Sequence, residues 1–299
     1  MRVLVVTAVP AERDAVTRAV GRPPSIRAVP GAEVHRAGPF DVVAGGAGPA
    51  AAAAATAFAL AAARTPGTGA ADSSTPDLGA PGSGTPGSGT PGSGSHDPGA
   101  RDSRSPDFWS PDFRPPDFRP PDDAPYGLVV SAGIGGGFAP AAPVGSLVVA
   151  SGIVAADLGA ETPDGFLPVT GLGFGRDLFV PPASLVREVA EATGAVRGRV
   201  LTVSTVTGSA DRTAALLAAH PGAVAEAMEG FGVAEAADRL GVPVLELRAV
   251  SNAVGPRDRD AWRIGEALAA LTEAFGKIAP VVEGWTHDRL DRLRAPHRD

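Results

Sequence analysis

The chain has 299 residues, of which 44% are hydrophobic and 20% charged, and its formal net charge is −7. This composition is ordinary for a soluble globular protein with one large domain or two small ones. The acidic balance argues against a general nucleic-acid binder, which would present a basic face. The chain has no cysteine, and its five histidines are scattered without ligand spacing, so we expect neither a metal nor another cofactor.

The amino terminus leads directly into an apolar segment and lacks the basic region, long apolar core and cleavage site of a signal peptide. We therefore expect a cytoplasmic protein. Residues 44–63 contain no charge over twenty positions, which is the length of a membrane span. Because this segment opens with three glycines and a proline and is mostly alanine, we interpret it as a buried helix and expect no membrane partner.

The chain begins with a predicted strand and helix. Residues 2–7 are almost wholly apolar, which is typical of a central strand covered on both faces. Residues 11–20 are predicted as a helix, with Pro10 near its first turn and Glu12 directly after. Glu12 is either a surface acid that complements the helix dipole or an acid of a functional site, and its position alone leaves both open.

A glycine-rich turn follows the next elements. Residues 25–29 and 32–35 are interpreted as a hairpin, and residues 40–44 as a strand that ends in the turn GGAG before a helix starting at Pro49. A strand, glycine turn and helix in this order present backbone N–H groups to an anion or a sugar. Because no Lys or Arg lies between Arg36 and Arg64, nothing in this turn would neutralise a free phosphate.

Residues 65–125 change abruptly to TPGSG repeats and PDFR-like units, with 13 prolines and 10 glycines. This composition predicts a disordered or extended insertion. Its aromatic PDF units are either a docking motif or part of a tolerated surface insertion, and we favour the second interpretation. Residues 1–64 and 126–285 then form a single domain, and residues 286–299 are a charged tail.

Strands and helices alternate after the insertion. This order predicts a three-layer α/β sandwich with a mixed, mostly parallel central sheet. The glycine-rich segment 132–138 indicates close approach of its backbone to a ligand, or a tight turn packed against a neighbour. The predicted strands are residues 128–131, 145–155, 157–166 as a continuation of the sheet, and 200–204, and the predicted helices are residues 181–193, 209–220 and 260–282.

Residues 226–259 combine an inward acid with a polar strand end. Apolar positions 233, 237 and 240 predict one buried helix face that includes Glu229, whereas Glu235 points outward. The helix is expected to end at Gly241, and a strand over residues 244–250 leads into Ser251 and Asn252. Polar groups at the end of a parallel strand usually meet a ligand.

The chain resembles the purine nucleoside phosphorylase and nucleosidase family in several segments that are specific when taken together. The match covers nearly all of the chain except the insertion and the tail. The resemblance is strongest to members that hydrolyse futalosine in the menaquinone pathway, and it implies a nucleoside phosphorylase-like fold in a homo-oligomer, a dimer or larger. The matching segments are VVTAVPAERDAV, GGAGPA, VVSAGIGGGF with VGSLVVAS, TVSTVTGSADR, AEAMEGFGVAEAADRLGVP and LRAVSNAVGPRDRDAW.

The resemblance implies roles for the matching residues. Glu12 would deprotonate the attacking water, Glu229 would bind the ribose hydroxyls, and Asn252 would face the base. Cleavage of an N-ribosidic bond needs a fixed sugar, a placed water and a polarised leaving base, and two inward acids suit the first two. The other expected substrate contacts are Met228, Ser251, Gly46, Ile134, Gly135, Thr207 and Arg257.

Asn252 departs from the aspartate that adenine-specific nucleosidases of this family carry after the serine. Hypoxanthine presents two adjacent acceptors, N7 and O6, and an amide offers two donors. This difference predicts selection of hypoxanthine over adenine, and therefore release of hypoxanthine from futalosine. A structural cap on the turn before Gly255 remains the alternative role for Asn252.

The basic residue that phosphorylases of this family use for phosphate is missing from the glycine turn, which favours water as the acceptor. Arg257 and Arg259 either meet the benzoate carboxylate of futalosine or are solvated loop charges, and Arg248 is expected to form a structural pair with Glu246. The alternative functions are cleavage of methylthioadenosine, aminofutalosine or inosine, or nucleoside binding without catalysis.

Overall fold

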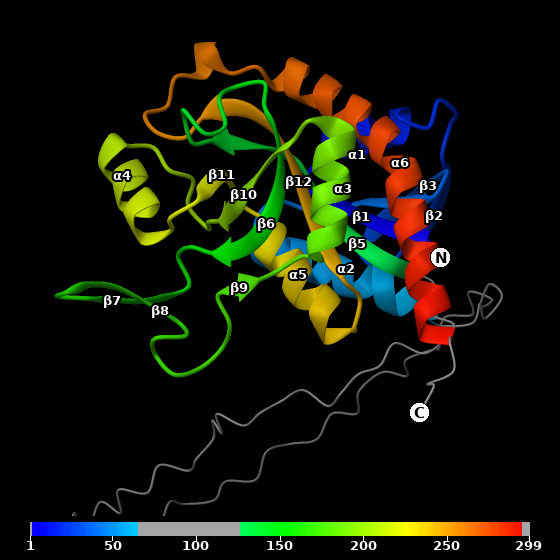
Figure 1. Cartoon of the computed structure of the whole chain (residues 1–299), viewed down its shortest axis with the longest axis horizontal. Coiled ribbons are helices and arrows are strands. Elements are labelled where there is room, and N and C mark those ends of the chain that lie inside the picture. Colours follow the sequence, from blue (N-terminus) through cyan, green and yellow to red (C-terminus); the bar gives the residue numbers. More distant parts are fainter. Residues whose placement is uncertain (1, 65–125, 295–299) are drawn as a thin grey trace, which may run out of the picture. The chain divides into compact units, whose positions relative to one another are not determined.

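Among the residues that the computed structural model describes, 2–64 and 126–294, ten strands form one mixed sheet (Figure 1). Parallel pairs join β5 to β1 and β12, and join β10 to β6 and β11, whereas β2, β3 and β4 pair antiparallel at one edge. The strands are β1 (Arg2–Thr7), β2 (Ser25–Val29), β3 (Ala32–Ala37), β4 (Phe40–Ala44), β5 (Tyr126–Gly137), β6 (Leu147–Ala155), β9 (Leu178–Phe179), β10 (Val196–Thr202), β11 (Ala223–Ala227) and β12 (Val244–Ala253).

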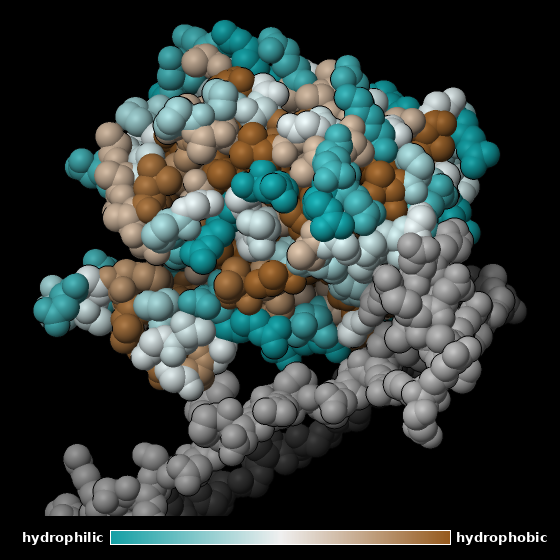
Figure 2. Space-filling model, in the orientation of Figure 1, coloured by the Kyte–Doolittle hydropathy of each residue, from teal (hydrophilic) through white to brown (hydrophobic). Residues whose placement is uncertain are grey.

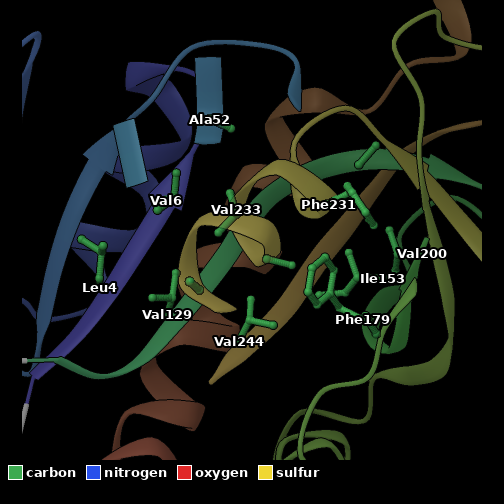
Figure 3. Close-up of a cluster of buried hydrophobic side chains, with 14 of the residues drawn as sticks. Leu4, Val6, Ala52, Val129, Ile153, Phe179, Val200, Phe231, Val233 and Val244 are labelled. Atoms are coloured by element: carbon green, nitrogen blue, oxygen red, sulfur yellow. The ribbon is translucent and has the colours of Figure 1, made fainter. Parts of the chain in front are cut away.

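Helices cover both faces of this sheet, which confirms the predicted α/β sandwich (Figure 1). One buried cluster joins the sheet to α1, α3 and α6, and another joins it to α2 and α5. Along β1, Val3 and Val5 belong to the first cluster, whereas Leu4 and Val6 belong to the second (Figure 3). The helices are α1 (Pro10–Arg18), α2 (Pro49–Arg64), α3 (Ala183–Thr193), α4 (Ala210–Ala219), α5 (Gly230–Arg239) and α6 (Ile264–Arg294).

Alternation of side chains explains why the central strands are apolar throughout. Successive residues of a strand point to opposite faces of the sheet, and both faces of this sheet are covered by helices. The uncharged segment 44–63 accordingly becomes the end of β4, the glycine turn and most of α2, whose buried residues include Ala52 and Leu60. No helix in the described part of the chain is long and apolar enough to cross a membrane.

The sheet closes on itself at one place. Strands β11, β10, β6, β12 and β5 are neighbours in that order, and a short antiparallel pairing joins β11 back to β5. In this pairing Ala225 lies opposite Gly137 and Glu226 lies opposite Gly136. The closure brings the end of β11 next to the glycine-rich end of β5.

Several elements differ from the sequence predictions. The predicted strand 128–131 extends through the glycine-rich segment to Gly137, so this segment is not a turn, and neighbouring groups lie close to its glycines. Residues 157–166 do not extend the sheet but contribute to a separate hairpin of β7 (Gly159–Thr162) and β8 (Gly165–Pro168). The last helix continues to Arg294, so the first part of the predicted tail is helical. Strands β9 and β11 were not predicted.

Some predicted regions cannot be compared with the structure. The insertion 65–125 with its PDF units and residues 295–299 of the predicted tail lie outside the described residues. The described residues all belong to one compact unit of the chain. A single domain over residues 1–64 and 126–285 therefore remains a proposal.

A buried ion cluster joins the starts of β1, β4 and β5 to the end of β3. Asp41 on β4 accepts hydrogen bonds from Arg2 on β1, from Arg36 on β3 and from the Tyr126 hydroxyl at the start of β5. Burial alone would raise the pKa of Asp41, but the donors outweigh it and hold this pKa below its ordinary value of 3.8. The charged carboxylate therefore stabilises the fold.

We expect Asp41→Asn to lower the free energy of unfolding at pH 7 by roughly 2 kcal/mol. This loss is smaller than for a fully buried ion pair, because solvent screens the half-exposed partner Arg36. A group with a depressed folded pKa contributes stability above its unfolded pKa and loses it as pH falls through the folded value. The difference from wild type should therefore narrow below about pH 4. Urea unfolding at several pH values measures this, with the exposed Asp164→Asn as control; a pH-independent difference would contradict the assignment.

Candidate active site

One cavity of about 400 Å³ collects most of the residues predicted from the sequence. It is lined by residues at or just beyond the carboxyl ends of β1, β5, β10, β11 and β12, the place where open α/β sheets usually bind ligands. The predicted residues that line it are Glu12, Ile134, Gly135, Thr207, Met228, Glu229, Ser251, Asn252 and Arg257.

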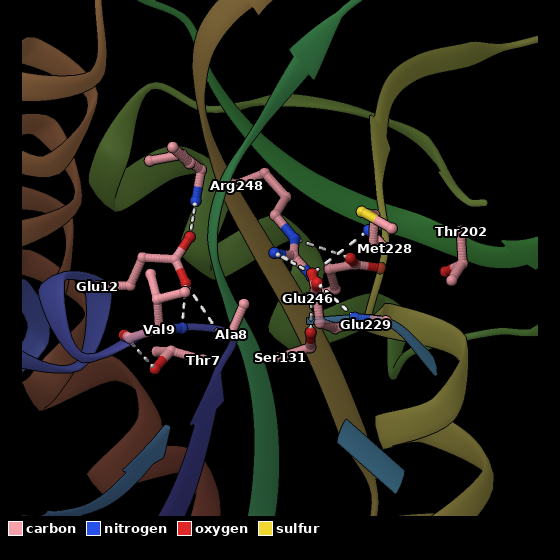
Figure 4. Close-up of polar contacts among 12 residues, drawn as sticks. Thr7, Ala8, Val9, Glu12, Ser131, Thr202, Met228, Glu229, Glu246 and Arg248 are labelled. Atoms are coloured by element: carbon pink, nitrogen blue, oxygen red, sulfur yellow. Dashed lines mark hydrogen bonds and ion pairs between the residues drawn. The ribbon is translucent and has the colours of Figure 1, made fainter. Parts of the chain in front are cut away.

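Glu12 is buried in the first turn of α1 and faces this cavity. Its Oε2 accepts the backbone N–H groups of Ala8 at 2.9 Å and Val9 at 3.2 Å, and its Oε1 accepts that of Ile134 at 2.8 Å (Figure 4). Glu12 is therefore not the surface acid of the first interpretation, because it is buried, bonds to N–H groups at the start of its helix and lines the cavity. Burial raises the pKa of the Glu12 carboxyl, while Arg248 and the backbone donors oppose that rise. A carboxylate with a raised pKa is a stronger proton acceptor.

Glu229 is buried immediately before α5, and its backbone carbonyl accepts the first hydrogen bond of that helix, from Val233. Its Oε1 accepts the N–H of Gly48 at 3.2 Å, and its Oε2 accepts the N–H of Met228 at 3.3 Å. The inward orientation predicted from the apolar helix face is therefore present. The glycine turn holds this carboxylate in place.

Gly46 does not line the cavity, in contrast to the expectation for this residue. Its N–H is donated to the carbonyl of Ala8 at 3.0 Å, so this group is already bonded within the protein. The N–H of Gly48, two residues later, contacts Glu229. The glycine turn therefore contributes to the site by orienting Glu229 through the N–H of Gly48.

Arg248 is the cation that joins the acids of the site (Figure 4). Its Nε donates to Glu246 at 3.0 Å, its Nη2 to Ser131 at 3.0 Å, and its Nη1 lies 3.2 Å from Oε2 of Glu229. The side chain is only 1% exposed, and the expected pair with Glu246 is present. The pair extends to Glu229, which makes it part of the site.

Glu246 lies behind this arrangement and is fully buried. Burial raises its pKa to about 7, and Arg248 only partly offsets the effect. Its second oxygen has no hydrogen-bond partner among the described residues. Because Glu12, Glu229 and Glu246 share one guanidinium, the network holds more acids than it has cations to balance them.

Asn252 is fixed by its neighbours on β12. Its Oδ1 accepts the Ser251 hydroxyl at 2.9 Å, and its Nδ2 donates to the Ala253 carbonyl at 3.0 Å. One of the two N–H groups expected for the base is thus already used inside the protein. A single N–H remains for a ligand.

Of the lining residues that sequence reasoning missed, Glu226 and Trp262 have side chains suited to binding a ligand. Glu226 is buried on β11, where it accepts the Thr207 N–H at 2.8 Å and is hydrogen-bonded to the Thr207 hydroxyl. An acid within an otherwise apolar run two residues before Met228 was the available signal. The guanidinium of Arg257 lies 5.3 Å from the ring centre of Trp262, whereas Arg259 does not line the cavity.

The sequence model of the Phosphorylase superfamily matches residues 125–283. The chain belongs to this superfamily. A futalosine hydrolase from Streptomyces coelicolor is 76% identical over 166 residues, which are 55% of this chain and 71% of that protein. A futalosine hydrolase from Acidothermus cellulolyticus is 44% identical over 184 residues, 58% of this chain and 72% of that protein.

Solved structures of other proteins share the fold. The futalosine hydrolase of Helicobacter pylori has a TM-score of 0.65 at 14% identity, over 94% of this chain and 98% of that one. A methylthioadenosine/S-adenosylhomocysteine nucleosidase from Colwellia psychrerythraea, solved with adenine, has a TM-score of 0.61 at 19% identity, over 93% and 95% of the two chains. These likenesses establish the nucleoside phosphorylase-like architecture.

Gly133→Ala tests the close approach of Glu12 and Arg248. A Cβ at this position would lie 2.5 Å from Oε1 of Glu12 and 2.8 Å from Nη1 of Arg248, so both side chains would have to move. Displacing catalytic groups by about 1 Å can cost about a hundredfold in rate, and we expect kcat/KM to fall by at least tenfold.

The matched control is Gly276→Ala in α6, where an added Cβ meets nothing within 4 Å. This variant should keep wild-type kinetics and gain about 0.5 kcal/mol of stability, as expected for alanine in a helix. Steady-state kinetics with circular dichroism as a check on folding measure both variants. Wild-type activity in a folded Gly133→Ala variant would contradict the close approach of Glu12 and Arg248 to this glycine.

Proposed function

We propose that this chain hydrolyses the N-ribosidic bond of futalosine, releasing hypoxanthine and dehypoxanthine futalosine in menaquinone biosynthesis. The observation that carries the proposal is the meeting of two buried acids and one oriented amide, Glu12, Glu229 and Asn252, in a single cavity. The relatives at 76% and 44% identity are futalosine hydrolases, which supports the choice of substrate.

Glu229 is placed to bind the ribose. Its Oε1, whose only partner among the described residues is the Gly48 N–H, accepts a hydroxyl proton of the sugar, and the carboxylate stabilises the positive charge that the sugar develops as the bond to the base breaks. Gly48 and Arg248 already hold this carboxylate before the substrate arrives. Little reorganisation is then needed in the transition state.

Glu12 is placed to activate water. A carboxylate offers about four lone-pair positions, and the three backbone donors on Glu12 leave one for a water molecule. The water oxygen bonds to the anomeric carbon, its proton passes to Glu12, and the electrons of the broken bond go to the base, which takes up a proton from solvent to become neutral hypoxanthine. The remaining N–H of Asn252 donates to N7 and stabilises the charge on the leaving base.

The charges around the cavity favour water over phosphate as the acceptor. Arg257 is the only cationic residue among those that line the cavity, and Arg248 is fully engaged with its own partners. Phosphate in a catalytic position is normally held by cationic side chains or by several free backbone N–H groups. The glycine turn, with its Gly46 and Gly48 amides donated within the protein, offers neither.

Arg257 and Trp262 can bind the benzoate group of futalosine, at the end of the substrate remote from the base. Both residues line the cavity, and the guanidinium of Arg257 lies over the Trp262 ring. A guanidinium binds a carboxylate through two parallel hydrogen bonds, and an indole ring stacks on an aromatic acid. We assign this pair to the benzoate group of the substrate.

The β7–β8 hairpin supports the proposal of a homo-oligomer. It extends away from the main sheet (Figure 1), and hydrophobic residues lie at the surface in this region (Figure 2). Large exposed apolar patches usually mark contact surfaces. A second copy of the chain is the partner that we propose for the exposed residues Leu158, Phe166, Leu167, Leu172, Phe174 and Val180.

The test of the function is base release from futalosine, aminofutalosine, methylthioadenosine and inosine, each with and without phosphate, followed by chromatography. We expect futalosine to have the highest kcat/KM and the rate to be independent of phosphate. Glu12→Gln should lower turnover by about 10²- to 10⁴-fold, the usual contribution of a general base. Glu235→Gln, which removes a surface acid outside the cavity, is the matched control.

The other outcomes identify the alternatives. Strict dependence on phosphate would make the protein a phosphorylase, and a preference for methylthioadenosine or inosine would make it a nucleosidase for another purine nucleoside. Calorimetry that detects bound but uncleaved futalosine would indicate a nucleoside-binding protein.

A further inference from the structure

Glu226 and Asn252 lie on opposite sides of Gly136, a position of the sheet that carries no side chain. Glu226 on β11 and Asn252 on β12 are both in register with Gly136, which belongs to the strand between them. Neighbouring strands are about 4.8 Å apart, so the backbones of β11 and β12 lie about 10 Å apart at this level, on either side of β5. Gly136 lines the cavity in the gap between Glu226 and Asn252, and a Cβ on it would lie 2.9 Å from Cγ2 of Val254 and 3.3 Å from Nδ2 of Asn252, so a side chain here would crowd the amide that faces the ligand.

Asn252 alone does not separate hypoxanthine from adenine. Its Oδ1 and one of its N–H groups are bonded to Ser251 and Ala253, which leaves one N–H for the base. Both purines present an acceptor at N7, and this single donor can bind either of them. A second group must therefore distinguish the two bases.

Glu226 is the acid of the cavity that the proposed reaction does not use. The charged residues that line the cavity are Glu12, Glu226, Glu229 and Arg257, and the other three already have roles. Glu226 is 5% exposed and its carboxylate is oriented by the Thr207 N–H and hydroxyl. These two donors leave lone pairs free for a ligand.

We propose that Glu226 is a specificity-determining residue that accepts the N1–H of hypoxanthine. The inference rests on the proposed function, because it assumes that a purine base occupies the gap beside Asn252. N1 lies on the edge of the purine remote from N7, and it carries a proton in hypoxanthine but a lone pair in adenine. A carboxylate opposite N1 attracts the first base and repels the second.

The test is Glu226→Gln, assayed with futalosine and aminofutalosine, which differ only in the base. The amide keeps the size of the side chain and an acceptor for Thr207, but it adds a donor suited to N1 of adenine. We expect kcat/KM for futalosine to fall about tenfold to a hundredfold and that for aminofutalosine to hold or rise. Glu235→Gln should leave the ratio of the two unchanged.

A purely structural role for Glu226, as an anchor for the Thr207 loop, predicts a different result. Loss of an anchor would lower kcat/KM for both substrates by the same factor, and an unchanged ratio would overturn the proposal. Glu226→Met, which has neither acceptor nor donor, should lose the preference for futalosine without gaining one for aminofutalosine. Circular dichroism checks that each variant is folded.

Binding of the free bases separates this inference from the proposed function. Calorimetry of wild type and Glu226→Gln with hypoxanthine and with adenine requires no cleavage. Wild type should bind hypoxanthine more tightly, and the variant should reverse or abolish that preference. If wild type leaves futalosine intact, the proposed function fails, and the base titration still decides the role of Glu226; equal preference in both proteins would refute that role.

Discussion

The buried guanidinium of Arg248 contacts Glu229, Glu246 and Ser131, and the arrangement of the site depends on this cation. Several carboxylates placed close together in a dry interior repel one another, and each loses its hydration. One guanidinium with donors in a rigid fork can hold three partners in fixed directions, which an ammonium cannot do. In the middle of β12, with its side chain 1% exposed, this cation has little freedom to move.

Glycines, which have no side chain, allow the charged groups of this network to lie close to one another. A Cβ at Gly230 would be 2.4 Å from both carboxylate oxygens of Glu246, and one at Gly232 would be 2.0 Å from the Pro49 carbonyl of α2. The glycines therefore let α5 approach the network and α2. The same helix start positions Glu229, so the packing of α2 and α5 and the orientation of the acid are linked. The network therefore depends on the absence of side chains at these glycines as well as on the pairing of its charges.

The general architecture followed from patterns that the sequence displays directly. Continuous apolar runs predicted covered strands such as β1, and the apolar face of α5 correctly placed Glu229 inside. Partners distant in sequence were harder to predict. The contact between Gly48 and Glu229 joins residues 181 positions apart, and no local pattern shows that this N–H meets an acid instead of a ligand. Glu226 was missed because β11 is short and alanine-rich, and only its pairing with β5 reveals its place beside Asn252.

The most direct test of this account is the rate of hypoxanthine release from futalosine by Arg248→Lys. Lysine keeps the positive charge and therefore the balance of the buried network, but its single ammonium cannot hold Glu229, Glu246 and Ser131 together. The account predicts a folded protein whose kcat/KM is at least about tenfold lower, because Glu229 is no longer held toward the sugar. A folded variant with the wild-type value would contradict the claim that this guanidinium organises the site.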